Sequence, residues 1–318
     1  MRKTIFRAVF LTALCFAVAL SAAAAEMLIP VGKVVGLSLA EGTVTVVAFD
    51  DKIGGEAQKA GLKIGDEIVS IDGTQIDSAA DLHEALTKSD GRVQITLNRD
   101  RQQRQIVMNP AVTDQGPRLG VYIREGVTGI GTITYYDPES GEFGALGHGV
   151  SNSQGKLARM DAGRIYQASV TSVKAGRVGQ PGQLKGAVSA LTPIGQLRVN
   201  CEHGVFGSCE SFTGEALPVG QAQKGPAKIL SNISGDTVET FCVEITKVFD
   251  EDNDNGRDLM LCVTDPDLLD TTGGIVAGMS GSPIIQNGCL VGAVTHVLVN
   301  DPTTGYGIRI ENMLDAAA

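Results

Sequence analysis

The segment with the clearest capacity for chemistry is Gly278-Met279-Ser280-Gly281-Ser282-Pro283. A serine next to glycine and close to a proline is typical of a tight turn that presents a nucleophilic hydroxyl. A glycine two residues earlier can direct its backbone N–H toward the same point as the serine N–H, and two such donors form an oxyanion hole. The sequence therefore predicts Ser280 as a nucleophile, with Gly278 and Ser280 as the oxyanion donors.

A serine nucleophile needs a general base within hydrogen-bonding reach, and the chain has only four histidines. His83 lies in an expected helix, and His203 lies between two cysteines in an expected loop. His296 lies in an apolar strand, where a packed structural histidine is expected. His148 alone lies in a turn between two glycines. We therefore expect His148 to be the base, and the pair predicts a serine peptidase.

The acid that orients this histidine is not selected by spacing, because it has only to be buried beside the imidazole. Asp161 follows the histidine motif, and Asp265, Asp267 and Asp270 precede the serine turn. All four stay candidates on the residues alone.

Composition and charge restrict the class of protein. The 318 residues are 43% apolar and 19% charged, which is typical of a globular chain. Forty glycines, the absence of tryptophan and frequent β-branched residues favour a turn-rich β protein. The net charge of −10, without a large basic cluster, argues against nucleic acid as a partner.

Residues 1–25 have the features of an export signal. Arg2, Lys3 and Arg7 precede the uncharged apolar run 8–20, and Ala23-Ala24-Ala25 offers a small-residue cleavage site. The apolar run is short for a membrane span, although neighbouring alanines could extend it. A cleaved signal peptide and an N-terminal membrane anchor both stay open, and both predict export across the cytoplasmic membrane.

Residues 26–110 are expected to form one small module. The segment Ala60–Gly73, with the helical pattern Ser78–Thr87 after it, resembles the core signature of a PDZ domain in its bacterial, protease-associated form. PDZ domains bind an extended peptide as an added strand. The resemblance places that peptide groove, facing the helix, along Val35, Gly36, Leu37 and Ser38. A purely structural module that packs on the next domain is the alternative.

Residues 111–318 follow a polar linker with two prolines and are rich in glycine. They carry short, spaced β-like runs without helical periodicity, which predicts one β-barrel or a pair of them.

This second half resembles the SpoIVB peptidase family of sporulation. The resemblance is carried by residues 129–138, 143–149, 272–276, 278–288, 294–296 and 300–302. It implies a mainly β protein, in which an N-terminal PDZ domain is followed by a chymotrypsin-like double β-barrel serine endopeptidase. It matches the family's histidine to His148 and its serine to Ser280. The family's aspartate matches Asp265, with Asp267 as a neighbouring alternative.

The same resemblance implies a signalling role. The family member cleaves itself near its N-terminus and cuts a membrane-embedded regulator, which frees an intramembrane protease to activate a late mother-cell sigma factor. The implied location is the space between the forespore and mother-cell membranes. A generic envelope quality-control protease and an inactive PDZ scaffold are the alternatives.

Two further patterns resemble metal sites only superficially. Cys201 and Cys209 flank a histidine but lack paired CxxC knuckles. We expect the five cysteines after the leader to be buried or loop thiols, with a Cys201–Cys209 disulfide as the alternative. The acidic segment 250–256 would place Cys262 where a calcium loop needs glutamate, so we expect a hairpin turn there. We therefore expect no metal and no cofactor.

Overall fold

The computed structural model describes residues 26–100, 102–114, 116–152, 155–249 and 256–318. The leader, residues 1–25, lies outside these ranges, as does all of the acidic segment except Gly256. The predictions made for them therefore stay predictions. Within the described ranges, none of the helices combines the length and the apolar character that a membrane crossing requires.

The first unit is a small sheet with two helices. Helix α3 (Ala79–Lys88) begins after Ser78, whose hydroxyl accepts the Asp81 N–H. Its apolar face packs into the core of the unit through Leu82 and Leu86. The other elements are the outer half of β2 (Val34–Phe49), α2 (Gly55–Ala60), β3 (Glu67–Ile71), β4 (Thr74–Gln75), β5 (Val93–Arg99), β6 (Gln102–Met108), and the hairpin β7 (Ala111–Thr113) and β8 (Gly116–Arg118).

The first barrel is a closed ring of six antiparallel strands. The ring closes because the inner half of β2 pairs with β9, from Val34 opposite Thr132 to Leu39 opposite Val127. Leu37, Phe143 and Ile165 are among the buried residues that fill it. In ring order the strands are β9 (Val121–Tyr136), β10 (Glu142–Ala145), β13 (Gly204–Cys209), β12 (Gln183–Cys201), β11 (Ala162–Lys174) and β2.

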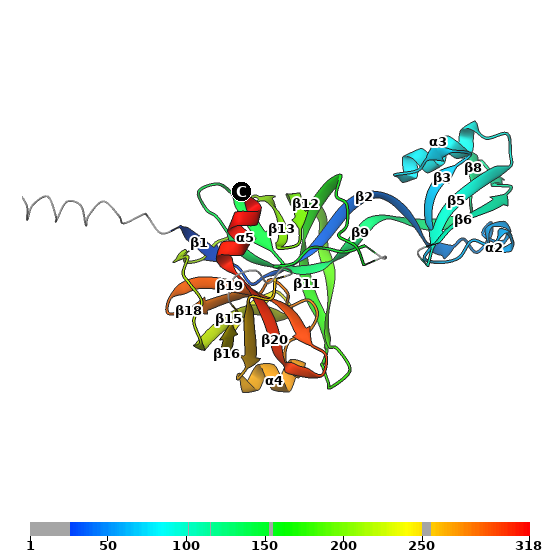
Figure 1. Cartoon of the computed structure of the whole chain (residues 1–318). Helices are drawn as coiled ribbons and strands as arrows, with labels where there is room; N and C mark the ends of the chain where they lie inside the picture. The colour runs from blue at the N-terminus through cyan, green and yellow to red at the C-terminus, as the bar shows by residue number, and fades with distance from the viewer. Residues whose placement is uncertain (1–25, 101, 115, 153–154, 250–255) are drawn as a thin grey trace, which may run out of the picture.

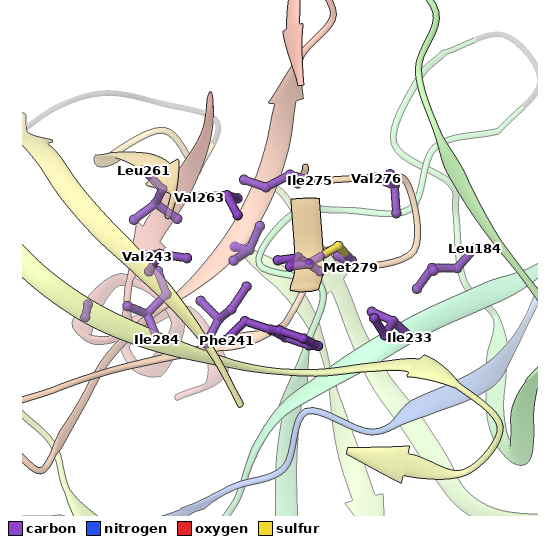
Figure 2. Close-up of a cluster of buried hydrophobic side chains, with 14 of the residues drawn as sticks. Leu184, Ile233, Phe241, Val243, Leu261, Val263, Ile275, Val276, Met279 and Ile284 are labelled. Carbon is purple, nitrogen blue, oxygen red and sulfur yellow. The ribbon is translucent and has the colours of Figure 1, made fainter. Parts of the chain in front are cut away.

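The second barrel is also closed and has its own apolar core. Phe241, Val263 and Ile284 meet in this core, and the fully buried Met279 packs in the same cluster (Figure 2). In ring order its strands are β15 (Gly225–Ser234), β16 (Thr237–Val248), β17 (Leu259–Val263), β20 (Asp301–Arg309), β19 (Cys289–Leu298) and β18 (Pro283–Gln286).

The remaining elements cover the ends of the barrels. Helix α4 (Pro266–Thr272) follows β17 at the bottom of the second barrel, and α5 (Ile310–Ala317) closes the chain at the opposite end (Figure 1). The short strands β1 (Met27–Pro30) and β14 (Leu217–Pro218) pair with each other beside β9. The predicted fold class, a mainly β chain with a PDZ-type unit and two β-barrels, is confirmed.

Strands β2 and β9 belong to both units, and the first unit stands apart from the barrels at the end of these two strands (Figure 1). Val44 and Leu119 lie in the core of the first unit. Val35 and Leu37 lie in the core of the barrel. Each of the strands β2 and β9 therefore runs from one hydrophobic core into the other. The sequence predicted that the first unit ends and the second begins at residue 110, between strands.

Candidate active site

The predicted nucleophile lies on a turn that is anchored from both sides. The side chain of Met279 is fully buried in the second barrel, so the residues before and after it are held at the surface of that core. From the first barrel, the Thr132 hydroxyl donates to the Gly278 carbonyl at 2.8 Å, and the Thr132 N–H donates to the Ser280 carbonyl at 3.3 Å. Gly278 has a φ of +101°, a conformation that favours glycine.

The two expected oxyanion donors are free to bind a ligand. Gly278 and Ser280 both line a cleft of about 750 Å³ between the barrels. Within the described ranges, neither the Gly278 N–H nor the Ser280 N–H donates to an acceptor of the chain. Two unpaired donors beside a serine hydroxyl are the arrangement that stabilises a tetrahedral oxyanion.

His148 lies in the same cleft, on the loop that follows β10. Gly147 brings this loop against the second barrel, where a Cβ at Gly147 would come within 2.8 Å of the Thr295 and Ile308 side chains. Asn200 holds the loop from the other side, because its side-chain amide bonds both the N–H and the carbonyl of Val150, at 2.8 and 3.0 Å.

The tautomer of the His148 imidazole follows from one contact with the backbone. The Nδ1 atom of His148 lies 3.0 Å from the Gly149 carbonyl oxygen, which can only accept a hydrogen bond. The proton therefore resides on Nδ1, and Nε2 is left unprotonated as a base. Burial lowers the pKa of His148 below its usual value, which favours this neutral form.

The Ser280 hydroxyl donates to the Thr295 carbonyl at 2.6 Å. This bond fixes the rotamer of the predicted nucleophile. A rotation of the Ser280 side chain is needed before its proton can pass to His148.

The structure does not bring Asp265 to His148. Asp265 is the N-cap of α4, and its carboxylate accepts the N–H groups of Cys242, Asp267 and Leu268 at 3.0, 3.1 and 3.2 Å. These bonds lower the pKa of Asp265. The sequence Asp-Pro favours this role, since proline is preferred at the first helical position and aspartate at the N-cap. The assignment of Asp265 as the acid of a triad is thereby corrected.

The other candidate acids also lie elsewhere. Asp267 is exposed in the first turn of α4, Asp270 is exposed further along it, and Asp161 pairs with Arg159 at 3.1 Å on the surface. Among the residues that the structure describes, no carboxylate contacts the His148 ring.

A second histidine, His296 on β19, completes the cleft. Its ring centroid lies 5.1 Å from that of His148, with an angle of 40° between the rings, and its Nδ1 is buried without a hydrogen-bond partner. Burial first, then His148 and Arg257, lower the pKa of His296 to about 4. The sequence predicts His296 as a packed core histidine, because strand alternation separates the two faces of β19 but does not show that one of them borders the cleft.

We expect a pH dependence from these two rings. The pKa of both is depressed in the folded chain, so the unfolded chain takes up protons first as the pH falls below 6.5. The free energy of unfolding should therefore decrease between pH 6.5 and about 4. The acid limb of kcat/KM should have its midpoint below 6.5, since His148 keeps its base form there.

Urea unfolding between pH 4 and 7.5 and a pH–rate profile measure these two effects. In His296→Phe the slope of stability against pH should become shallower. An unchanged slope in that variant would show that His296 does not titrate as described.

The predicted peptide groove along Val35, Gly36, Leu37 and Ser38 is wrong. Both edges of this part of β2 are already paired, with β11 on one side and β9 on the other. An added strand needs free backbone N–H and C=O groups, and none are left there. Leu37 instead lines the catalytic cleft.

The groove of the first unit lies between α3 and the outer part of β9. Residues 121–125 of β9 pair with β2 along one edge, and no other described strand pairs with them. A hollow of about 650 Å³ separates this edge from α3, with Leu82, His83 and Leu86 on the helix side. This is the arrangement to which an extended peptide adds as a strand.

We expect the substitution His83→Glu to repel peptides that end in a free C-terminal carboxylate. His83→Glu places a negative charge in the groove from an exposed helix position and should weaken binding about 5- to 10-fold, about 1 kcal/mol of electrostatic cost. Ala80→Glu, on the same helix but outside the groove, is the control. Fluorescence anisotropy with labelled peptides measures both, and equal affinities would show that peptides do not bind along α3.

The fold and the cleft define a class, a serine peptidase that carries a PDZ-type unit. A family model described as SpoIVB peptidase S55 matches residues 115–314, and a PDZ domain model matches residues 35–109. The chain belongs to the SpoIVB peptidase S55 family.

The other comparisons found more distant similarity. No curated protein matches the chain. Among solved structures, an inactive form of the Rv3671c protease is similar at 14% identity with a TM-score of 0.35, over 60% of this chain and 82% of that chain. The inactive form of a serine-to-alanine mutant of Rv3671c from M. tuberculosis H37Rv is similar at 13% identity with a TM-score of 0.32, over 60% and 80%.

Proposed function

We propose that this peptidase is an exported signalling protease of sporulation that uses Ser280 as its nucleophile and His148 as its base. The observation that carries the chemistry is that both residues line one cleft beside two unpaired backbone N–H groups. The signalling role is supported by membership of the SpoIVB peptidase S55 family, and export by the leader-like residues 1–25.

The proposed reaction begins when the Ser280 hydroxyl rotates from the Thr295 carbonyl toward Nε2 of His148. His148 takes the proton as the serine oxygen attacks the peptide carbonyl, and the N–H groups of Gly278 and Ser280 stabilise the oxyanion. His148 then gives this proton to the leaving amine. A water molecule, deprotonated by His148, releases the acyl group and restores the serine.

The orientation of His148 in this mechanism comes from a neutral group. The Gly149 carbonyl fixes the tautomer of His148, and the neutral ring of His296 lies beside the His148 ring. A neutral acceptor stabilises the imidazolium less than a carboxylate does. A modest turnover rate is consistent with a protease that cuts few bonds.

The proposed targets are the chain's own N-terminal region and a membrane-embedded regulator of an intramembrane protease, whose cleavage leads to activation of a late mother-cell sigma factor. The proposed location is the space between the forespore and mother-cell membranes, with residues 1–25 acting as a signal peptide or an anchor. Support comes from the family and from the peptide groove along α3.

Incubation of the purified full-length chain, followed by N-terminal sequencing of its fragments, tests this function. We expect one or a few cuts near the N-terminus in the wild type and none in Ser280→Ala. Cleavage at the same rate in Ser280→Ala would exclude Ser280 as the nucleophile. Many cuts in unfolded casein, with no selective cut in a membrane protein, would indicate quality control instead of signalling.

A further inference from the structure

Two glycines on the cleft side of β9 have opposite surroundings. At Gly131, a Cβ would lie 2.4 Å from Cδ2 of Leu146 and 2.8 Å from Cδ1 of Leu37, so these side chains already fill the space of the missing side chain. At Gly129, two residues away on the same face of the strand, a Cβ would meet no atom within 4 Å. Gly129 therefore leaves an open hollow.

This hollow lies in the wall of the catalytic cleft. Gly129 pairs with Leu37 across the ladder, and the two line the cleft together with Ser280. Around them the wall of the first barrel is apolar, with Leu39, Val127, Ile130, Leu146 and Val150. Because Ser280 and this wall line the same cleft, a peptide whose carbonyl reaches Ser280 can place a neighbouring side chain against the wall.

The polarity of the wall determines which kind of substrate side chain can bind against it. The charged residues that line the cleft in the described part of the chain are Glu202 and Arg257, which are both exposed and carry opposite charges. No charged group lies among the apolar residues of the wall to pair with an ion, so a charged side chain would lose hydration there without compensation. An apolar side chain gains free energy in proportion to the apolar area that it buries there.

We propose that Gly129 is a specificity-determining residue, and that its hollow accepts a large apolar side chain of the substrate next to the scissile bond. The inference deepens the proposed function and rests on Ser280 as the nucleophile. It assigns the substrate class as extended peptide segments with a bulky aliphatic or aromatic residue near the cut.

The test is to fill the hollow. Gly129 has no positive φ, and valine there meets no atom at its Cβ and has a higher strand propensity than glycine, so Gly129→Val should fold. The control is Thr128→Val, which keeps the shape of the side chain at an exposed neighbour whose side chain alternates to the other face of β9. Cleavage sites of wild type, both variants and Ser280→Ala are mapped on one peptide library by mass spectrometry.

In wild type and Thr128→Val we expect one position near the cut to be rich in Leu, Ile, Met and Phe. In Gly129→Val this preference should shift to Gly and Ala, with a roughly 10- to 100-fold loss of kcat/KM for peptides with a large apolar residue at that position. An unchanged preference, or an equal loss for all peptides, would overturn the inference while leaving Ser280 as the nucleophile. If Ser280→Ala retains full activity, the proposed function itself fails.

Discussion

His148→Gln is expected to lower kcat/KM on the order of 10⁴- to 10⁶-fold, whereas Asp265→Asn should change it no more than about threefold. The reason for the first effect is that His148 supplies the proton acceptor beside Ser280 in the cleft. The reason for the second is that the Asp265 carboxylate caps α4 and bonds three backbone N–H groups. Cleavage of a fluorogenic peptide by each purified variant measures both.

The free energy of unfolding also distinguishes the helix-capping role of Asp265 from the proposed catalytic role of His148. Loss of the charged cap in Asp265→Asn should lower the free energy of unfolding by about 1 kcal/mol or less, because asparagine still caps a helix, while Asp265→Ala should cost about 1 kcal/mol or more. His148→Gln should unfold close to the wild-type denaturant midpoint. If Asp265→Asn instead loses activity by about 10⁴-fold with wild-type stability, the carboxylate acts in catalysis and the structural assignment is wrong.

The second large effect is expected for Gly278→Ala, with a loss of kcat of about 10²- to 10³-fold. The φ of Gly278 is +101°, and an added Cβ would lie 2.9 Å from the Leu184 Cβ. Alanine must therefore change the backbone of the turn, and this change moves the Gly278 N–H, the proposed oxyanion donor. Because KM depends little on this donor, the loss should appear mainly in kcat.

Gly288→Ala is the matched control for this variant. Gly288 also has a positive φ, +78°, but a Cβ there meets no atom within 4 Å, and the residue lies in the hairpin between β18 and β19. Both variants should lose about 1 kcal/mol of stability from backbone strain, yet only Gly278→Ala should lose activity. A double variant with Leu184→Gly, which removes the contacting Cβ, should not recover kcat, because the strain in φ remains. Recovery would show that the contact, and not the oxyanion donor, limits the rate.

Local sequence was sufficient to predict the PDZ-type unit and the two turns that hold Ser280 and His148, the proposed nucleophile and base. Ser280 and His148 each lie in a turn whose glycines are needed by the backbone, with φ values of +101° at Gly278 and +69° at Gly147. The conformation of such turns depends on adjacent residues, so it can be predicted from the sequence without knowledge of the fold. The capping pattern of α3 and its buried leucines are local in the same way.

The groove could not be placed from the sequence, because strand pairing is not local. Val35 to Ser38 and residues 121–123 are both strand-like, and only the ladder shows that the first stretch is paired on both edges while the second keeps one edge open. The sequence also assigned each strand to one domain, whereas β2 and β9 pass through both. A peptide groove depends on the free edge, which is a property of the assembled sheet.

What the sequence alone determined is therefore the conformation of single turns: the turn of the proposed nucleophile Ser280 after Gly278, and the turn of His148 between glycines. Tertiary structure decided what surrounds that pair. It put Asp265 on a helix N-terminus, brought His296 to within 5.1 Å of His148, and left the hollow at Gly129 open beside Ser280. The physical reason is that turns are set by the φ of neighbouring residues, while the cleft forms only where two separately closed barrels meet.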